Sequence, residues 1–454
     1  IQQAKIMSQK YDVVCTNPPY MGRRGMNAKL VKYLDKNFQD SKTDLFAVFM
    51  ELNDIYLKNN GFMGMINQHS WMFLSSYEKL REKLINSRCI YNMIHLGPHA
   101  FEEIGGEVVQ STTFVARNCN MKKYNGSFIR LVEFNTAKSK EIKTLEAIKN
   151  ENISYRYIAA VSSFYKIPGY PITYWVSKRV KEIFNLGKPL GDIAYPRKGN
   201  TTTDNDRFLR LWHEVDIKKV NFNKKEIFKS ETLYKRWFPY NKGGQYRKWY
   251  GNNEYLIDWK NDGEEIRRIP TAVIANYQFF MKEGLTWSTV SSKKFSIRRF
   301  GNGFIFDNGG CCLFTNDREY YLALLNSNVF NYIFAEINPT LNFQSGQIAK
   351  FPVIFVNENI KVIINKLSKI NCVISKTDWD SFETSWDFKD HPLLTHKKES
   401  DTIEEAFNNW SIFAENQFNQ LKANEEELNR IFIDIYGLQD ELTPAVDDKD
   451  VTIT

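Results

Sequence analysis

The stretch YDVVCTNPPY, residues 11–20, decides how the first part of this 454-residue chain is expected to fold. Residues 11–15 are a short apolar run rich in β-branched side chains, which predicts a buried strand. The strand must end at residues 17–20, because two consecutive prolines fix two φ angles and remove two backbone N–H donors. The stretch therefore predicts a rigid rim at the carboxyl end of a strand, the edge where open α/β sheets bind ligands.

Helix and strand patterns alternate beyond this rim. Apolar residues recur at helical spacing over residues 45–57, directly after a capping Asp44, and the apolar run 62–66 predicts the next strand. Such alternation predicts an α/β fold with a parallel sheet. The same patterns predict a mobile basic loop over 21–26, helices over 27–37, 76–84, 138–150 and 175–186, and strands over 90–96 and 108–116.

The motif Asn17-Pro18-Pro19-Tyr20 after an apolar strand resembles the catalytic motif of amino-group methyltransferases, above all the adenine-N6 DNA methyltransferases. An exocyclic adenine amine is a poor nucleophile, because its lone pair is delocalised into the ring. The resemblance implies that the Asn17 side-chain oxygen and the Pro18 carbonyl accept its hydrogens and localise that pair. Tyr20 would then stack on the extruded base. The alternative is a Pro-Pro turn that arose by chance.

The same resemblance implies S-adenosylmethionine as the cofactor, with contacts from Asn17 and Asp44. Because the methyl donor is a sulfonium, neither a nucleophilic side chain nor a metal ion is needed. Phe101 matches the aromatic residue that stacks on the far face of the base, and a core phenylalanine is the alternative. His95 and His99 flank a Gly-Pro turn and are interpreted as structural. Acid–base catalysis by Glu102, Glu103 or Glu107 is not required.

The Gly-rich cofactor loop that such enzymes carry upstream of this motif is not found in residues 1–10. We therefore expect either a fragment or a protein whose cofactor half lies on another polypeptide.

Charge is unevenly distributed along the chain, whose net charge is +8. Residues 181–300 contain 24 Lys and Arg against 14 Asp and Glu, whereas residues 371–454 contain 7 against 19. The basic middle predicts a polyanionic partner, and two solvated surfaces are the alternative. Within it, basic residues are interleaved with aromatic, amide and hydroxyl side chains that are able to contact phosphates and base edges. The predicted DNA-binding residues are Arg197, Lys198, Asn205, Arg207, Lys242, Gln245, Tyr246, Arg247, Lys248, Ser292, Lys293, Lys294 and Arg298.

Nearly the whole chain resembles the PglX family, the adenine-specific methyltransferases of BREX phage-defence systems, from the catalytic motif onward. The resemblance implies half of a Rossmann-like methyltransferase sheet, an α+β target-recognition domain and a helical carboxyl-terminal region. The expected domains are a partial methyltransferase domain over 1–135, a helical connector over 136–186, a recognition domain over 187–355 and an acidic helical region over 356–454. Double-stranded DNA and other BREX defence proteins are the expected partners.

Two further functions stay open at this point. The missing cofactor loop motivates the first, a DNA-recognition protein that is catalytically silent. Protein-glutamine methyltransferases also use Asn-Pro-Pro-Tyr, although they have little need for a basic, aromatic-rich domain. The six cysteines show no metal-ligand spacing, and no apolar run is long enough to span a bilayer. A cytoplasmic protein with reduced thiols and no metal is therefore expected.

Overall fold

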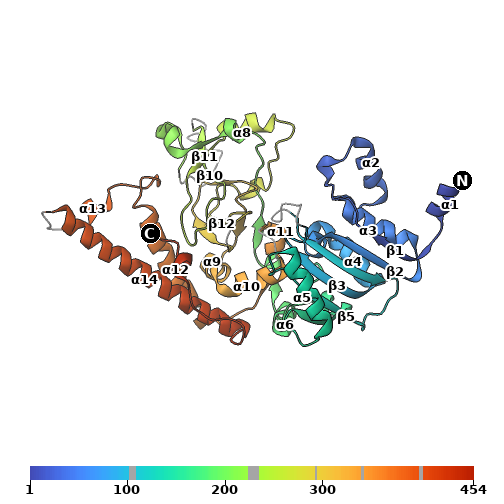
Figure 1. Ribbon diagram of the computed structural model, residues 1–454. Helices are drawn as coiled ribbons and strands as arrows, with labels where there is room; N and C mark the ends of the chain where they lie inside the picture. Colours follow the sequence, from blue (N-terminus) through green and yellow to red (C-terminus); the bar gives the residue numbers. More distant parts are fainter. Residues whose placement is uncertain (102–108, 223–234, 292–293, 339–341, 398–401, 454) are drawn as a thin grey trace. The chain divides into compact units, whose positions relative to one another are not determined.

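The computed structural model describes residues 1–101, 109–222, 235–291, 294–338, 342–397 and 402–453. The chain forms two compact units (Figure 1). The first holds Ile1–Asn185 with Glu336–Pro339, and the second holds Leu186–Ala335 with Thr340–Thr454. The division lies one residue from the boundary predicted after residue 186. The boundaries predicted after residues 135 and 355 fall inside the units.

The first unit is built on a six-stranded sheet with the order β1-β2-β4-β3-β5-β6. β1 pairs with β2 in parallel, whereas β4 is antiparallel to both β2 and β3, so the parallel sheet expected from the alternation is in fact mixed. The strands are β1 (Tyr11–Thr16), β2 (Leu57–Gln68), β3 (Cys89–Gly97), β4 (Ser111–Arg117), β5 (Asn125–Arg130) and β6 (Arg156–Ala160).

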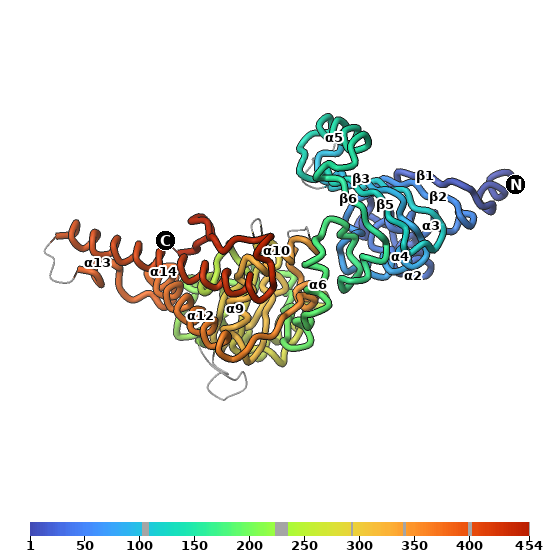
Figure 2. Tube along the Cα trace, turned by 90° about the horizontal axis from the view of Figure 1, so that it is seen from below, coloured from blue at the N-terminus to red at the C-terminus, as the bar shows by residue number. Residues whose placement is uncertain are grey.

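Helices cover both faces of this sheet, as the view in Figure 2 shows for α5 on one side and α3 and α4 on the other. Met93 and Phe128 pack in the core under α3 and α4, whereas their neighbours Ile94 and Ile129 pack against α5. This alternation follows from the two-residue period of a strand. The helices of the unit are α1 (Gln2–Ser8), α2 (Ala28–Asn37), α3 (Leu45–Tyr56), α4 (Glu78–Ser87), α5 (Ala137–Lys149) and α6 (Lys178–Leu186).

Strand β1 lies at the edge of the sheet and is not the buried strand that its apolar sequence predicted. Val14 packs against the core, whereas Val13 is 58% exposed and Cys15 is also exposed. Among the described residues, β1 pairs with a strand on one side alone, and α5 covers the other end of the sheet, over β3 and β5.

The second unit contains two four-stranded sheets with the orders β14-β10-β11-β9 and β13-β12-β15-β8, and a two-stranded ribbon of β16 and β7. Aromatic side chains such as Tyr240, Trp259 and Phe306 fill the core beside them. The strands are β7 (Lys188–Pro189), β8 (Tyr195–Arg197), β9 (Leu209–Leu211), β10 (Trp237–Asn241), β11 (Tyr255–Asp258), β12 (Gly284–Trp287), β13 (Ile297–Phe300), β14 (Ile305–Phe306), β15 (Cys312–Phe314) and β16 (Pro352–Val353).

Two long helices, α12 (Glu358–Trp379) and α14 (Ile403–Tyr436), dominate the rest of the second unit (Figure 1). The shorter helices are α7 (Asn205–Phe208), α8 (Lys260–Arg267), α9 (Arg318–Asn326), α10 (Asn328–Ile337), α11 (Ser345–Ile348) and α13 (Pro392–Thr395). Asn357 caps α12 by accepting the N–H of Ile360 at 3.0 Å, and Gly437 ends α14 in the left-handed conformation. The helical tail expected from residue 356 is therefore present, packed in one unit with the basic middle.

Candidate functional site

The strand register brings the predicted catalytic motif to one edge of the first sheet. Ser111, the first residue of β4, pairs with Gln68 at the end of β2 and with Gly97 at the end of β3. Because β1 runs parallel to β2, residues 17–20 leave β1 at this same edge. Three strands thus end together beside the motif, which is the position where α/β sheets bind ligands.

The motif itself forms a partly open rim. Asn17 and Pro19 are exposed, Pro18 is buried and Tyr20 is half-buried. The Tyr20 ring packs edge-on against Phe46 of α3, with 6.2 Å between ring centroids and an interplanar angle of 82°. Burial raises the pKa of the Tyr20 hydroxyl, and the neighbouring Ser111 hydroxyl opposes the shift. Asn17 is therefore exposed on a rim that the packing of Tyr20 against Phe46 supports, and its catalytic role stays a prediction.

Asp44 ties the segment after the motif to the start of α3. Its Oδ1 accepts the backbone N–H of Met21 at 3.0 Å and that of Phe46 at 3.3 Å, and burial raises its pKa. The backbone N–H of Leu45 donates to the Met21 carbonyl at 3.1 Å. The basic loop expected to be mobile is thus held at its start, and Arg23 further along is paired with Asp35 at 2.7 Å.

The predicted stacking residue Phe101 is half-buried and follows the end of β3 by four residues, so it lies on the carboxyl-terminal side of the strand that meets the same edge. Glu102, Glu103 and Glu107 lie outside the described residues. The stacking role of Phe101 stays a prediction.

A buried histidine pair under this edge was not predicted as a pair. His69 Nδ1 and His95 Nε2 are 2.8 Å apart, and both residues are buried. Burial lowers the pKa of His69 to about 4 and lowers that of His95 well below its ordinary value. The sequence placed His95 in a predicted strand and His69 just beyond another, but only the pairing of β4 with both β2 and β3 brings the two together. His95 has the structural position expected of it.

In the second unit, four loops join through their backbones and present part of the predicted DNA-binding set. They contain residues 198–201, 241–245, 288–290 and 307–310. Gly310 allows the close approach, because a Cβ atom there would lie 2.3 Å from the Asn241 carbonyl oxygen. The joining bonds run from Asp307 N to Asn241 O at 2.9 Å, Asn308 N to Asn200 O at 2.8 Å and Thr289 N to Gly309 O at 2.8 Å.

Asp307 is the buried anchor of these loops. Its Oδ2 accepts from the Tyr240 hydroxyl and from Lys242 Nζ, each at 2.9 Å. Lys242 is therefore partly neutralised within the protein, whereas Lys198 and Gln245 are exposed. We refer to Lys198, Lys242 and Gln245 with the four loops as the recognition loops.

Three other predicted contacts lie on neighbouring surface elements. Arg197 is half-buried, with its guanidinium over the rings of Tyr195 and Phe279. Asn205 and Arg207 are exposed on α7, where Arg207 pairs with Glu265 at 2.7 Å. Ser292 and Lys293 lie outside the described residues.

For two of the remaining predicted contacts, Lys248 and Arg298, burial contradicts direct DNA binding. Lys248 is buried in an ion pair with Glu425, and Arg298 is 1% exposed with its pKa lowered by burial to about 10. Tyr246 is half-buried and its burial raises its pKa, so its DNA contact stays a prediction. A buried cation cannot neutralise a phosphate in solution. The sequence pattern failed here because it gives no register between segments more than 100 residues apart.

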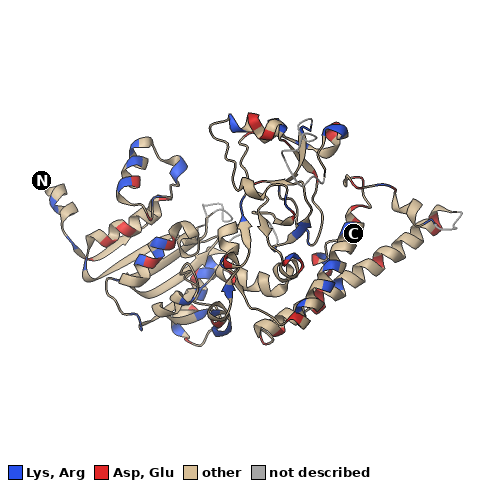
Figure 3. Ribbon diagram, turned by 180° about the vertical axis from the view of Figure 1, so that it is seen from behind, with Lys and Arg blue, Asp and Glu red and all other residues tan. Residues whose placement is uncertain are grey.

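Arg247 and Lys294 also form ion pairs with acidic residues of the second unit. Arg247 pairs with Asp378 at 2.5 Å, stacked over Trp379, and Lys294 pairs with Asp450 at 2.7 Å. The charged residues of these loops and of the long helices are shown in Figure 3. Part of the excess positive charge of the middle segment is therefore neutralised by the acidic segment within one unit.

Among the described residues, no group of three or more His, Cys, Asp or Glu side chains is arranged to hold a metal ion. Within the same residues, every helix is too short or too polar to cross a membrane.

The chain is similar in sequence to known methyltransferases. Residues 2–101 match the model of the Eco57I restriction-modification methylase family. The chain is 44% identical over its full length to the adenine-specific methyltransferase PglX of Lacticaseibacillus casei (strain Zhang), covering 38% of that protein. It is 40% identical over 98% of its length to the adenine-specific methyltransferase BrxX of Escherichia coli O9:H4 (strain HS), covering 35%.

Among solved structures, the Type IIL restriction-modification enzyme MmeI in complex with DNA aligns with 95% of this chain and 55% of its own, with a TM-score of 0.57 at 12% identity. At this level of sequence identity, the similarity to MmeI concerns the fold alone. The chain spans little more than a third of the length of the curated relatives it matches. By its sequence, the whole chain is homologous to one part of the adenine-specific methyltransferases PglX and BrxX.

Proposed function

We propose that this chain forms the base-accepting rim and the DNA-recognition part of an adenine-N6 DNA methyltransferase of a BREX-type phage-defence system. The observation that carries the proposal is the exposed Asn17 on a proline-stiffened rim, at an edge where three strands end and Tyr20 is braced by Phe46. The homology to PglX and BrxX, whose names describe adenine-specific methyltransferases, supports the same reading.

The chemistry follows from the two acceptors on the rim. A paired adenine does not reach Asn17, so the base must be flipped out of the duplex at a cost of a few kcal/mol. The Asn17 side-chain oxygen and the Pro18 carbonyl then accept the two amine hydrogens and localise the nitrogen lone pair. The two prolines stiffen the rim that carries both acceptors, so we expect their stabilisation to act where charge develops in the transition state.

The residues present fit the base-accepting half of such a site better than the cofactor half. S-adenosylmethionine, when bound, supplies the methyl group on a sulfonium centre. Asp44, the predicted contact, uses Oδ1 to accept two backbone N–H groups, so this oxygen is engaged in holding the rim. In the described part of the chain, β1 pairs on one side alone and exposes Val13 and Cys15, so this edge offers a surface for a segment that holds the cofactor.

The recognition loops are the proposed DNA contacts. Lys198 is an exposed cation that suits a phosphate, and Gln245 is an exposed amide that suits a base edge. Lys242 is expected to attract DNA less strongly from a distance than Lys198, because its ammonium group is already paired with Asp307.

The decisive experiment is methyl transfer by the Asn17→Ala variant. A protein of the relatives' length that carries this chain is incubated with duplex DNA and S-adenosylmethionine labelled in the methyl group. We expect loss of label transfer with unchanged DNA affinity, whereas Asn120→Ala, an exposed asparagine far along the chain, retains activity. Equal transfer by Asn17→Ala and the parent would overturn the assignment.

A catalytically silent recognition protein is the second candidate, because Oδ1 of Asp44, the predicted cofactor contact, is already engaged by two backbone N–H groups. Methyl transfer by the protein of the relatives' length separates the candidates, since no label transfer by the parent protein supports the silent one. Isothermal titration of this chain alone with S-adenosylmethionine is expected to show weak or undetectable binding. A salt series with duplex DNA tests the third reading, a protein-glutamine methyltransferase. That reading requires no DNA affinity and no salt dependence.

A further inference from the structure

The four recognition loops each begin where a strand of the second unit ends. β8 and β12 are both antiparallel to β15, so they run in the same direction, and β10 runs parallel to β14. The loops that follow these strands are bonded to one another through their backbones. A side chain on these loops therefore starts from a fixed backbone position.

Asn308 combines such a fixed backbone with an unoccupied side-chain amide. Its backbone N–H donates to the Asn200 carbonyl at 2.8 Å, and its own carbonyl accepts the Thr289 hydroxyl at 2.7 Å. The flanking residues are held as well, because the buried Asp307 carboxylate accepts the Gly309 N–H at 2.5 Å. The Asn308 side chain is exposed, and within the described residues its amide has no hydrogen-bond partner.

Val290 lies on the loop that is bonded to Asn308. Thr289, directly before it, donates its backbone N–H to the Gly309 carbonyl at 2.8 Å, and the Thr289 carbonyl accepts the Phe343 N–H at 2.7 Å. The Val290 side chain is nevertheless 69% exposed. A single exposed valine is ordinary on a protein surface. Here, however, it is one residue away from the group that holds a free amide.

An amide together with an apolar side chain matches one kind of base pair in the major groove. The amide offers a donor group and an acceptor, which pair with N7 and the N6 amino group of adenine, whereas guanine presents two acceptors there. Thymine is the base that carries a methyl group, and apolar side chains contact it. The two side chains are therefore complementary to adenine paired with thymine.

We propose that Asn308 and Val290 read an A·T base pair of the target site, with the Asn308 amide bonded to adenine and Val290 against the thymine methyl group. The fixed backbone reduces the conformational entropy that binding costs. Neither residue belongs to the DNA contacts predicted from the sequence, which shows neither their exposure nor their proximity. This inference rests on the proposed DNA-recognition function and adds a base pair that the recognition loops read.

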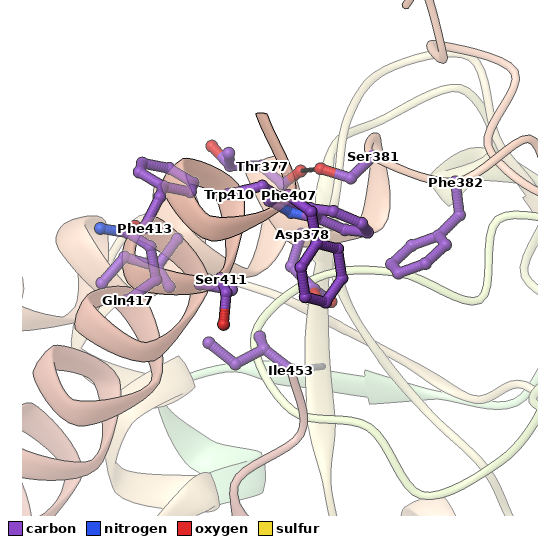
Figure 4. A pocket seen from close by; sticks show the side chains of 12 residues that line it. Thr377, Asp378, Ser381, Phe382, Phe407, Trp410, Ser411, Phe413, Gln417 and Ile453 are labelled. Carbon is purple, nitrogen blue, oxygen red and sulfur yellow. Dashed lines mark hydrogen bonds between the residues drawn. The ribbon is translucent and has the colours of Figure 1, made fainter. Parts of the chain in front are cut away.

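A second surface feature of the unit, the apolar groove between α12 and α14, does not suit DNA (Figure 4). Its lining contains aromatic side chains such as Phe407 and Trp410, the carboxylate of Asp378, and neither Lys nor Arg. The lining thus offers no counter-charge to phosphates, in contrast to the recognition loops with Lys198.

The first test selects bound duplexes from a library of random sequences with the full chain and determines their sequences. We expect Asn308→Ala to lose the preference for adenine at one position of the parent's target and to keep the other positions. Its affinity for random duplexes and its salt dependence should equal the parent's, because an amide neutralises no phosphate. Asn408→Ala is the matched control, since Asn408 is exposed on α14 and has no side-chain partner among the described residues.

Modified bases at that position test the two contacts separately. 7-Deazaadenine lacks the N7 acceptor and should weaken binding by the parent about tenfold, without effect on Asn308→Ala. Uracil in place of thymine lacks the methyl group and should weaken binding by the parent about fourfold, without effect on Val290→Ser. Val362→Ser, at a similarly exposed position on α12, should respond to uracil as the parent does.

The possible results separate this inference from the function on which it rests. A parent chain that binds no duplex DNA would contradict the recognition function and this inference with it. A parent that binds DNA without sequence preference, or a target sequence that Asn308→Ala and Val290→Ser select unchanged, would overturn this inference alone. A change of preference confined to a G·C position would do the same.

Discussion

Lys248 and Glu425 form a buried ion pair although 177 residues separate them in the sequence. The second carboxylate oxygen of Glu425 accepts the indole N–H of Trp249 at 2.6 Å, so both oxygens are engaged. Helix α14 is thereby joined to the loop that follows β10, and the acidic tail and the basic middle become one structure. This relationship explains why a segment with a strongly negative charge packs against a positive one instead of remaining an independent tail.

We predict that Glu425→Gln destabilises the protein by about 3–5 kcal/mol, because it leaves the Lys248 ammonium group buried without a counter-charge. Urea unfolding followed by circular dichroism measures this change. Combining Lys248→Met with Glu425→Gln should restore most of the loss, because the double variant buries no charge and keeps an acceptor for the Trp249 indole N–H. A double variant as unstable as the single one would show that the pair is not the source of the effect.

Local pattern was sufficient for the elements near the catalytic motif. Residues 45–57 were predicted as a helix from apolar spacing and the cap at Asp44, and α3 spans Leu45–Tyr56 with that cap in place. The antiparallel insertion of β4 and the edge position of β1 were not predicted, because strand order is set by packing between distant segments. The exposure of Val13 follows from that strand order and cannot be recognised from the apolar residues around it.

The candidate DNA contacts divide for a similar reason. Residues 242–248 are a single basic, aromatic run in the sequence, so their composition predicted DNA binding along the whole run. In the structure, Gln245 faces solvent, whereas Lys248 is turned into the interface with α14. Predicting this division requires knowing that Glu425 lies opposite, which depends on the tertiary fold.

The recognition loops give a salt-dependent prediction. Lys198→Ala should reduce the slope of log affinity against log salt concentration by about one, the value expected for one lost phosphate contact. Lys294→Ala is the control, since Asp450 already neutralises that ammonium group. Gln245→Ala should leave the slope unchanged and reduce discrimination between target and non-target duplexes. Equal slopes for Lys198→Ala and the parent would remove Lys198 from the interface.

Tyr20 offers a test of stacking separate from hydrogen bonding. Tyr20→Phe keeps the ring against Phe46 and should retain most of the methyl transfer in the full-length protein. Tyr20→Ala removes the face offered to the base and should cost about 1–3 kcal/mol, which is roughly a 5- to 150-fold loss in kcat/KM. A fluorescent base analogue at the target position reports flipping directly. If Tyr20→Phe is as inactive as Tyr20→Ala, the hydroxyl and not the ring carries the role.

The histidine pair makes stability depend on pH. Burial lowers the pKa of His69 to about 4, and the cations of Arg130 and Lys140 act in the same direction on His95. An unfolded histidine, with a pKa of about 6.5, binds a proton between pH 6.5 and 4, whereas the folded His69 does not. The unfolded state therefore gains protons as pH falls, and stability is lost through that window.

For His69 the loss between pH 7 and pH 5 is about 2 kcal/mol. We predict that His69→Gln, which keeps a polar partner for His95, reduces the difference in unfolding free energy between these two pH values by that amount. His213→Asn, at an exposed position, is the matched control. Because the comparison uses the difference between two pH values, any constant destabilisation by His69→Gln cancels. An unchanged difference in that variant would mean that His69 is protonated in the folded protein and that its burial does not exclude the charged form.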